Sequence, residues 1–257
     1  MAGTVTLGDA DAHGIALLTL SNPGKLNALS VAMWRQLRDA FDVVTAAPPR
    51  VVIVRGADGQ FAAGGDIDEF PSFRFDRATL QDFHENVVLP ALSAMLACDV
   101  PLVAQIEGAC IGAGLEIAAC CDIRIAGHGS RFGVPTAKLG FPMALAEIEI
   151  VSHAVGAAVL RELLIEARVL DADEARERGL VTRVVADAQV PTEAHAAAER
   201  IARLSPQALR LNKRALRVLT HPAFGPAAER AAHYDYADCA EHREGLAAFI
   251  EKRNPRF

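Results

Sequence analysis

The sequence predicts a mixed α/β fold followed by a helical C-terminal region. Short apolar runs rich in β-branched residues, such as "VVIVRG" at 51–56, alternate with stretches whose apolar residues recur at helical spacing. Runs of about four to eight residues are typical of buried strands, whereas longer periodic stretches are typical of helices. After residue 140 the sequence pattern becomes mainly helical, and from 191 onward nearly every segment has a helical pattern. We therefore expect a core at 1–190 and a helical region at 191–257.

Local signals predict the elements of the first half. "VTL" and "IALLTL" flank a polar turn and predict a hairpin. Ser30 is placed to cap a helix that the proline pair at 48–49 ends. Residues 71–78 are expected to form a connection, and the helix that follows, over 79–97, should kink at Pro90. Three further strands are expected at "PLVAQIEG", "DIRIA" and "RFGV".

The second half is mainly helical in pattern. "VGAAVLRELLIEARVLDADEARERGL" predicts a helix, a turn and a second helix, and "VTRVV" predicts the last strand. Four helices should follow, at "TEAHAAAERIARL", "PQALRLNKRALRVL", "PAAERAAHYDYADC" and "HREGLAAFIEK".

Composition argues against several classes of partner. The chain has 26 Lys and Arg against 32 Asp and Glu, a net charge of −6 that nucleic-acid backbones repel. Its basic stripe (Arg210, Lys213, Arg214, Arg217) is typical of a solvated helix face. Five cysteines without CxxC or HxxxH spacing predict neither a disulfide framework nor a metal site. Without a signal-peptide pattern or an apolar run of about eighteen residues, we expect a reduced, soluble, cytoplasmic protein with no nucleic-acid or membrane partner.

The segment "GACIGAGLEIAACCD" at 108–122 places three glycines directly before a lone acid, Glu116. A dinucleotide-binding turn would have its third glycine at Ile117, which is too large for close packing of helix on strand. An anion-binding loop fits this segment better. The glycines let the chain turn sharply, which leaves backbone N–H groups unpaired at the N-terminus of a helix. "AAGGD" at 62–66 has the same character. If the two loops are adjacent, two N–H groups can aim at one oxygen beside the Glu116 carboxyl, forming an oxyanion hole with an acid/base.

Five segments together resemble the crotonase superfamily, the enoyl-CoA hydratases and isomerases. They are "NPGKLNAL" (22–29), "FAAGGDIDEF" (61–70), "PLVAQIEGACIGAGLEIAACCDIRIA" (101–126), "RFGVPTAKLG" (131–140) and "EGLAAFIEKRNPRF" (244–257), in the family's order. The resemblance implies a spiral of ββα units with a C-terminal helical region used in trimer formation. It further implies a homotrimer or a dimer of trimers acting on an acyl-CoA thioester, with coenzyme A as part of the substrate and no separate cofactor.

The resemblance also implies roles for individual residues. The backbone N–H groups of Gly65 and Ala113 would hold the thioester oxygen, and Glu116 would carry the proton. Alanine at 113 replaces the family's middle glycine, which is acceptable because only a backbone donor is needed there. Each donor would lower the barrier by roughly 3 kcal/mol. The residues implied to contact coenzyme A are Lys25, Leu26, Ala28, Ala63, Gly65, Asp66, Ile67, Ile111, Gly112 and Lys252.

The sequence departs from the hydratase pattern after Pro135. The family's second catalytic glutamate is here Thr136, whose hydroxyl orients a water but is no carboxylic acid. The glycine-rich stretch that follows is replaced by "FPMALAEIEI", which introduces Glu147 and Glu149. Three hypotheses stay open. Glu116 alone serves a slow hydratase or an isomerase, Glu147 replaces the missing acid, or the chain has another CoA-thioester reaction or binds acyl-CoA without turnover.

Simpler explanations compete for several of these residues. Glu116 is alternatively a structural acid bonded to backbone N–H groups, and Asp66 is expected to cap the helix after Gly65. At least one of Glu147 and Glu149 is expected to be exposed, because on a helix they point in different directions. The eight histidines are scattered, and His84 has no partner by spacing. We expect inert packing for Cys98, Cys110, Cys120 and Cys121. RNA binding, a third class of function, is disfavoured by the acidic charge.

Overall fold

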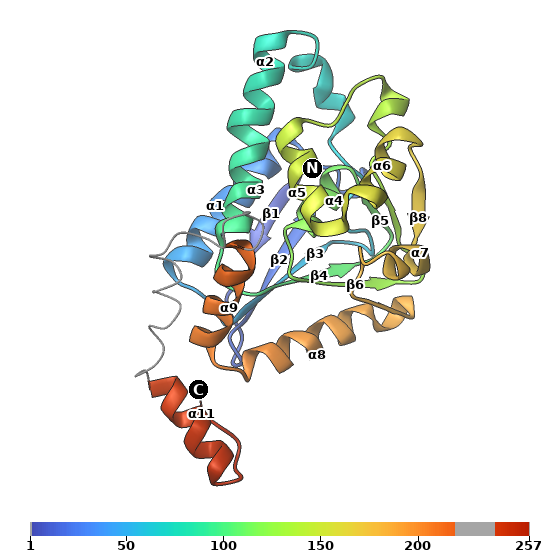
Figure 1. Cartoon of the computed structure of the whole chain (residues 1–257). Coiled ribbons are helices and arrows are strands. Elements are labelled where there is room, and N and C mark those ends of the chain that lie inside the picture. The colour runs from blue at the N-terminus through green and yellow to red at the C-terminus, as the bar shows by residue number, and fades with distance from the viewer. Residues whose placement is uncertain (1, 219–239, 257) are drawn as a thin grey trace.

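The structure is a computed structural model that describes residues 2–218 and 240–256. Its main sheet has the order β1-β2-β3-β4-β6-β9, with β1 antiparallel to β2 and the other neighbours parallel (Figure 1). The strands are β1 (Thr4–Leu7), β2 (Ile15–Ser21), β3 (Val51–Gly56), β4 (Leu102–Ile106), β6 (Ile123–Gly127) and β9 (Arg183–Val185). A smaller sheet, of order β5-β7-β8, contains β5 (Ala109–Ile111), β7 (Arg131–Gly133) and β8 (Val169–Asp171).

Helices connect and cover these strands. The α-helices are α1 (Val31–Ala46), α2 (Arg77–Asp82), α3 (Leu89–Ala97), α4 (Ala113–Ala119), α5 (Leu145–Val155), α6 (Ala157–Ile165), α7 (Ala172–Glu177), α8 (Val190–Ala202), α9 (Pro206–Val218) and α11 (Ala240–Ile250). Three 3-10 helices are η1 (Ile67–Ser72), η3 (Pro135–Leu139) and η4 (Asp187–Gln189), and η2 (Phe83–Val88) is a π-helix. The predicted hairpin and the Ser30 cap are confirmed, the Ser30 side chain accepting the Met33 N–H at 3.2 Å.

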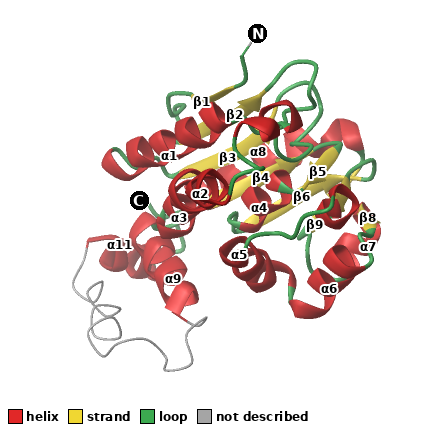
Figure 2. Cartoon of the chain, turned by 90° about the horizontal axis from the view of Figure 1, so that it is seen from above, coloured by secondary structure: helices red, strands yellow, loops and turns green. Residues whose placement is uncertain are grey.

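Both faces of the main sheet are buried under helices. On one face Ile15, Ile53 and Val103 pack against the alanines of α8, which runs along the sheet in Figure 1. Neighbouring positions such as Leu18 and Val54 point the opposite way and join the larger core with α1, α3 and α4. Figure 2 shows α1 and α3 lying over that second face. Burial on both faces explains why "VVIVRG" is a continuous apolar run rather than an alternating one.

The helix predicted over 79–97 is divided into three parts. An α-helical turn, α2, is followed by the π-helix η2, and α3 begins with Pro90 in its first turn. The predicted kink at Pro90 is therefore a π-helical turn that lies before the proline. The proline ring disrupts regular α-helical hydrogen bonding in the turn that precedes it. The π-helix carries His84 on the wider turn.

Three basic residues of α9 attach it to the segments that follow α3 and α4. The Lys213 ammonium lies 2.7 Å from the Asp122 carboxylate, and the Arg214 and Arg217 side chains both contact Asp99. Lys213 is 9% exposed, so the prediction of a solvated basic face is wrong there. These cations are bound to protein carboxylates and are not available as a phosphate-binding stripe.

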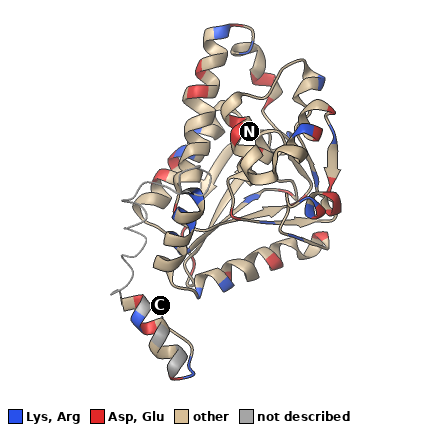
Figure 3. Ribbon diagram, viewed as in Figure 1, with Lys and Arg blue, Asp and Glu red and all other residues tan. Residues whose placement is uncertain are grey.

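The C-terminal helices are partly described. The predicted helix "PAAERAAHYDYADC" lies outside the described residues, and the division at residue 190 stays a prediction. In Figure 1, α11 lies away from the sheet, near α9. Acidic and basic residues are interspersed along α8 in Figure 3. The Arg200 and Glu193 side chains of this helix pair at 2.8 Å. Within 2–218 and 240–256, every helix is too short or too polar to cross a membrane.

Candidate active site

The two glycine-containing loops lie side by side. The Ala62 N–H donates to the Ala109 carbonyl at 2.8 Å, and the Ile111 N–H donates to the Ala62 carbonyl at 3.0 Å. Where the sequence predicts a loop between β4 and α4, the chain therefore forms the short strand β5. This pairing brings the segment ending at Gly65 next to the segment that leads into Ala113, as the oxyanion hypothesis requires.

Two glycines make this approach possible for different reasons. Gly112 has φ +50° and ψ −116°, a conformation that residues with a Cβ rarely adopt. Gly114 has an ordinary helical backbone, but a Cβ on it would lie 2.4 Å from the Ala62 carbonyl oxygen. The first glycine permits the turn, and the second lets α4 begin against the neighbouring loop.

Gly114→Ala is expected to destabilise the fold by about 1–3 kcal/mol, because the added methyl group meets backbone that cannot rotate away. The shift should also displace the Ala113 amide and lower turnover. Thermal unfolding and an enoyl-CoA assay measure the two effects. Gly8→Ala is a matched control, since its added Cβ would lie 3.7 Å from the nearest atom. Equal melting temperatures for both variants would contradict the close-approach explanation.

The amides of Gly65 and Ala113 remain without acceptors. Ala113 is the first residue of α4, where a backbone N–H has no partner within the helix. Neither N–H donates to any group in the described part of the chain. Both residues line one cavity of about 120 Å³, together with Trp34, Phe70 and Met143 among others. Two unpaired donors therefore border the same small, largely apolar space.

Glu116 lies in the first turn of α4 and lines this cavity. The residue is 7% exposed, and its carboxyl group accepts no hydrogen bond from the described residues. Burial raises the pKa of Glu116 well above its usual range, the Glu147 charge raises it further, and Arg74 opposes both effects. A structural acid would be bonded to neighbouring N–H groups, so the geometry favours an acid that is open to a ligand.

Glu147 faces the same cavity from the first turn of α5 and is buried. Its Oε1 lies 2.5 Å from His84 Nδ1 on the π-helix. An N–O contact this short requires a hydrogen bond in which one of the two atoms carries the hydrogen, because two lone pairs would repel. Spacing along the chain could not reveal His84 as a partner, since 63 residues separate the pair. Glu149, in contrast, is exposed, as expected for one of the two glutamates.

Arg74 is a cavity residue that sequence reasoning missed, because it lies in the segment interpreted as a connection. Its guanidinium carbon is 4.2 Å from the Phe70 ring centroid and 3.7 Å from that of Phe141. Its Nε is buried with no hydrogen-bond partner among the described residues. The aromatic residues that flank it in "SFRF" are not the ones that contact it, so the sequence gives no local signal of this packing.

Comparisons with known proteins identify the family. The family model for enoyl-CoA hydratase/isomerase matches residues 10–257. The chain belongs to the enoyl-CoA hydratase/isomerase family. A probable enoyl-CoA hydratase of Mycobacterium leprae is 33% identical over 246 residues, covering 95% of this chain and 94% of the relative. The 2,3-dehydroadipyl-CoA hydratase of Escherichia coli is 33% identical over 247 residues, with the same coverage of both chains.

The fold comparison leads to the same family. The crystal structure of an enoyl-CoA hydratase/carnithine racemase from Magnetospirillum magneticum has a TM-score of 0.94, at 39% identity, and covers 99% of this chain and 95% of that chain. The expected crotonase fold is therefore confirmed, and the chain is an enoyl-CoA hydratase-like enzyme whose family implies an acyl-CoA substrate.

Half of the ten residues implied by the family to contact coenzyme A line the cavity. Ala63, Gly65, Ile67, Ile111 and Gly112 line it. Leu26 is 54% exposed beside them, its carbonyl accepting the Ala63 N–H, whereas Ala28 is buried. Lys252 follows α11 and is not among the lining residues. Thr136, at the second-acid position, forms part of the cavity wall from η3.

Asp66, the residue after Gly65, forms an ion pair with Lys25. Asp66 caps η1, as predicted, and both of its oxygens lie 2.7 Å from the Lys25 ammonium. Asp68 binds the same ammonium at 2.8 Å. These hydrogen bonds raise the pKa of Lys25 above its usual value. A phosphate group would have to compete with two carboxylates for this lysine, so its role with coenzyme A stays a prediction.

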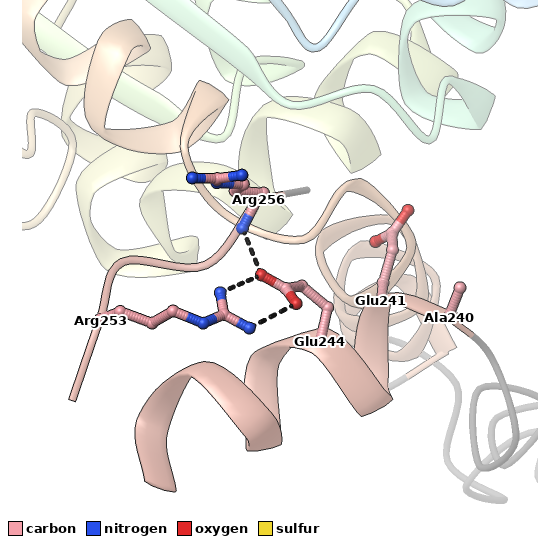
Figure 4. Close-up of a pocket in the computed structure, with 5 residues that line it drawn as sticks. All are labelled: Ala240, Glu241, Glu244, Arg253 and Arg256. Carbon is pink, nitrogen blue, oxygen red and sulfur yellow. Dashed lines mark hydrogen bonds and ion pairs between the residues drawn. The ribbon is translucent and has the colours of Figure 1, made fainter. Parts of the chain in front are cut away.

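A second hollow, of about 640 Å³, lies beside α11 (Figure 4). Arg253 donates to both oxygens of Glu244 at 2.6 and 2.9 Å, and the Arg256 N–H donates to the same carboxylate at 2.7 Å. The Arg253 hydrogen bonds, followed by that from Arg256, lower the pKa of Glu244 to about 2. The Arg253 and Glu244 side chains bind each other, and we do not place the chemistry in this hollow.

The four described cysteines are free and buried. Burial raises the pKa of Cys121 to about 12 and that of Cys120 well above its usual value, so the reactive thiolate form is disfavoured. Packing, as expected, is their role. Among the described residues, no three His, Cys, Asp or Glu side chains are grouped closely enough to hold a metal ion.

Proposed function

We propose that this enzyme hydrates a 2-enoyl-CoA thioester through a stabilised enolate. A single observation supports this most strongly: two buried carboxyl groups, Glu116 and Glu147, border one cavity beside two unpaired backbone amides. Hydration needs one group to take a proton from water and another to give a proton to carbon. A second acid at Glu147 would therefore replace the glutamate that is absent at Thr136.

The thioester oxygen would lie between the Gly65 and Ala113 amides. Charge develops on that oxygen when water adds to the conjugated double bond, and fixed donors in a dry cavity stabilise the charge. A small cavity favours a short acyl group, because 120 Å³ is well below the roughly 300 Å³ at which pockets for drug-sized ligands begin. The coenzyme A part would extend outward past Leu26, Ala63 and Ile67.

The two acids would divide the proton transfers. Glu147, held by His84, accepts a proton from water as the water oxygen bonds to Cβ, and the double-bond electrons move to the thioester oxygen. Glu116, whose raised pKa keeps it protonated, then donates its proton to Cα as the enolate collapses. Glu116 lies three residues after Ala113 on α4, close to the amide that would hold the thioester oxygen. This position suits proton donation to Cα, because Cα is bonded to the carbonyl carbon. A proton passing from Glu147 to Glu116 through solvent restores the starting state.

Isomerisation between 2-enoyl and 3-enoyl thioesters is the second candidate, because Thr136 stands where hydratases have their second glutamate. An assay with crotonyl-CoA and with a 3-enoyl-CoA, following water addition and double-bond movement separately, tests both. We expect 3-hydroxyacyl-CoA to form from the first substrate. Tight thioester binding without turnover of either substrate would overturn the proposal in favour of an acyl-CoA-binding protein.

The proposal also covers the oligomeric state of the enzyme. We infer a homotrimer or a dimer of trimers formed through the helical region 191–257, with the acyl-CoA site in the core 1–190. Light scattering with size-exclusion chromatography measures the assembly directly, and a monomer at micromolar concentration would contradict it.

A further inference from the structure

Arg74 is packed between two aromatic rings and makes no ion pair with any residue in the described part of the chain. Two phenyl rings, Phe70 and Phe141, contact the guanidinium and fix its plane. Within residues 2–218 and 240–256, no carboxylate oxygen lies within 4.0 Å of its nitrogens. The side chain nevertheless lines the cavity that contains Glu116 and Glu147. An arginine in this position carries its charge at neutral pH, because the guanidinium does not deprotonate in proteins.

The Arg74 guanidinium also makes no hydrogen bond with the described residues. Its Nε is enclosed without a partner, while the two terminal nitrogens, also unpartnered among the described residues, remain accessible. Buried polar groups are nearly always satisfied in folded proteins, and an exception calls for an explanation such as an absent ligand. The planar fork of an arginine matches the two oxygens of a carboxylate.

The carboxyl groups of the cavity leave this charge available. The Glu147 carboxylate is hydrogen-bonded to His84, and Glu116 is the group that we expect to be protonated, so both act on Arg74 only through longer-range electrostatics. Neither makes an ion pair with Arg74 within 4.0 Å. An acyl chain ending in a methyl group would leave the guanidinium unsatisfied, whereas a chain ending in an anion would satisfy it.

We propose that Arg74 binds a carboxylate at the far end of the acyl chain, so that the preferred substrate is the CoA thioester of an unsaturated dicarboxylic acid. This inference rests on the proposed hydration of enoyl-CoA and names the acyl class for that site. Arg74 is then a specificity-determining residue, and the phenyl rings of Phe70 and Phe141 position it.

Matched substrate pairs test the proposal. The pairs are trans-2-pentenedioyl-CoA with trans-2-pentenoyl-CoA, and trans-2-hexenedioyl-CoA with trans-2-hexenoyl-CoA, so that only the terminal group differs. The wild type should favour the carboxylate-ended member of at least one pair by about 10- to 100-fold in kcat/KM, the range of a charge-assisted hydrogen-bonded pair. Arg74→Gln should abolish this ratio mainly through KM, and Arg74→Lys should restore part of it.

Controls separate specificity from a general loss of function. Arg77→Gln removes an exposed arginine three residues away and should keep the wild-type ratio. Circular dichroism checks that each variant is folded. A wild type that favours the methyl-ended member of both pairs, or an Arg74→Gln variant that keeps the wild-type ratio, would overturn the proposal.

A binding measurement keeps the inference independent of turnover. Saturated pentanedioyl-CoA and pentanoyl-CoA cannot be hydrated, and calorimetry compares their affinities for wild type and Arg74→Gln. Tighter binding of the dicarboxylic thioester by the wild type alone supports the role of Arg74, even if no enoyl-CoA is hydrated and the proposed function fails. Equal affinities in the wild type would refute it, even if crotonyl-CoA is turned over.

Discussion

Glu116→Gln is expected to lower kcat for hydration by about 10²- to 10⁴-fold, the usual contribution of a general acid–base group. The amide has nearly the same shape as the carboxyl group but has no proton to donate to Cα. The Gly65 and Ala113 amides are untouched, so substrate should still bind with a similar KM. Steady-state kinetics with crotonyl-CoA measure this effect. Exchange of the Cα hydrogens of butyryl-CoA in deuterated water should be lost as well.

The pH dependence offers a second readout for Glu116. As a proton donor with a raised pKa, it should make the wild-type rate fall as the pH rises through that pKa. Folding raises this pKa above the ordinary 4.5, so the folded chain binds the proton more tightly than the unfolded chain. The wild type therefore loses stability as the pH rises from about 4.5 toward the folded pKa. Glu116→Gln should consequently gain in melting temperature relative to wild type between pH 5 and pH 8.

These results would distinguish catalysis from a structural role. A variant that melts at a higher temperature but turns over slowly has lost catalytic activity without losing stability. This is the pattern expected when a functional residue destabilises the fold. If Glu116→Gln instead melts at a lower temperature at pH 8 and keeps most of its activity, the acid is structural and the proposed mechanism is wrong.

Local patterns were sufficient to predict the centre of the site. Glycines at 112 and 114 and the acid at 116 follow one another within a single turn, so their geometry depends on few distant contacts. The Ser30 cap and the β1–β2 hairpin were predictable for the same reason. The residues alone did not show that the loop ending at Gly65 lies next to this turn. The family resemblance supplied that expectation.

Other parts of the site depend on contacts between distant segments. His84 meets Glu147 because the π-helix and α5 pack around the same cavity, and no spacing along the chain encodes that meeting. Arg74 lies in a segment that has neither strand nor helix periodicity. The three-residue strands β5 and β8 are too short to show a pattern and form because longer neighbouring elements place them. Sequence alone therefore indicated a thioester oxyanion site but not the groups that surround the acyl chain.

Glu147→Gln is expected to lower the hydration rate by about 10²-fold while keeping Cα hydrogen exchange, which separates it from Glu116→Gln. Only water activation at Cβ requires a base at this position in the proposed mechanism. The amide can still bond to His84, so the packing of α5 against the π-helix should survive. Glu149→Gln, an exposed neighbour on the same helix, is the control and should behave as wild type.

The two acids should also be coupled through their charges. The Glu147 charge helps to raise the pKa of Glu116, and exchange begins when the Glu116 carboxylate takes a Cα hydrogen. Removal of the Glu147 charge should therefore move the low-pH limb of the exchange reaction toward lower pH. A shift in that direction, together with lost hydration, would show that two carboxyl groups act on one substrate from α4 and α5. If Glu147→Gln hydrates crotonyl-CoA at the wild-type rate, Glu116 works without a second acid, and Thr136 becomes the residue that orients the water.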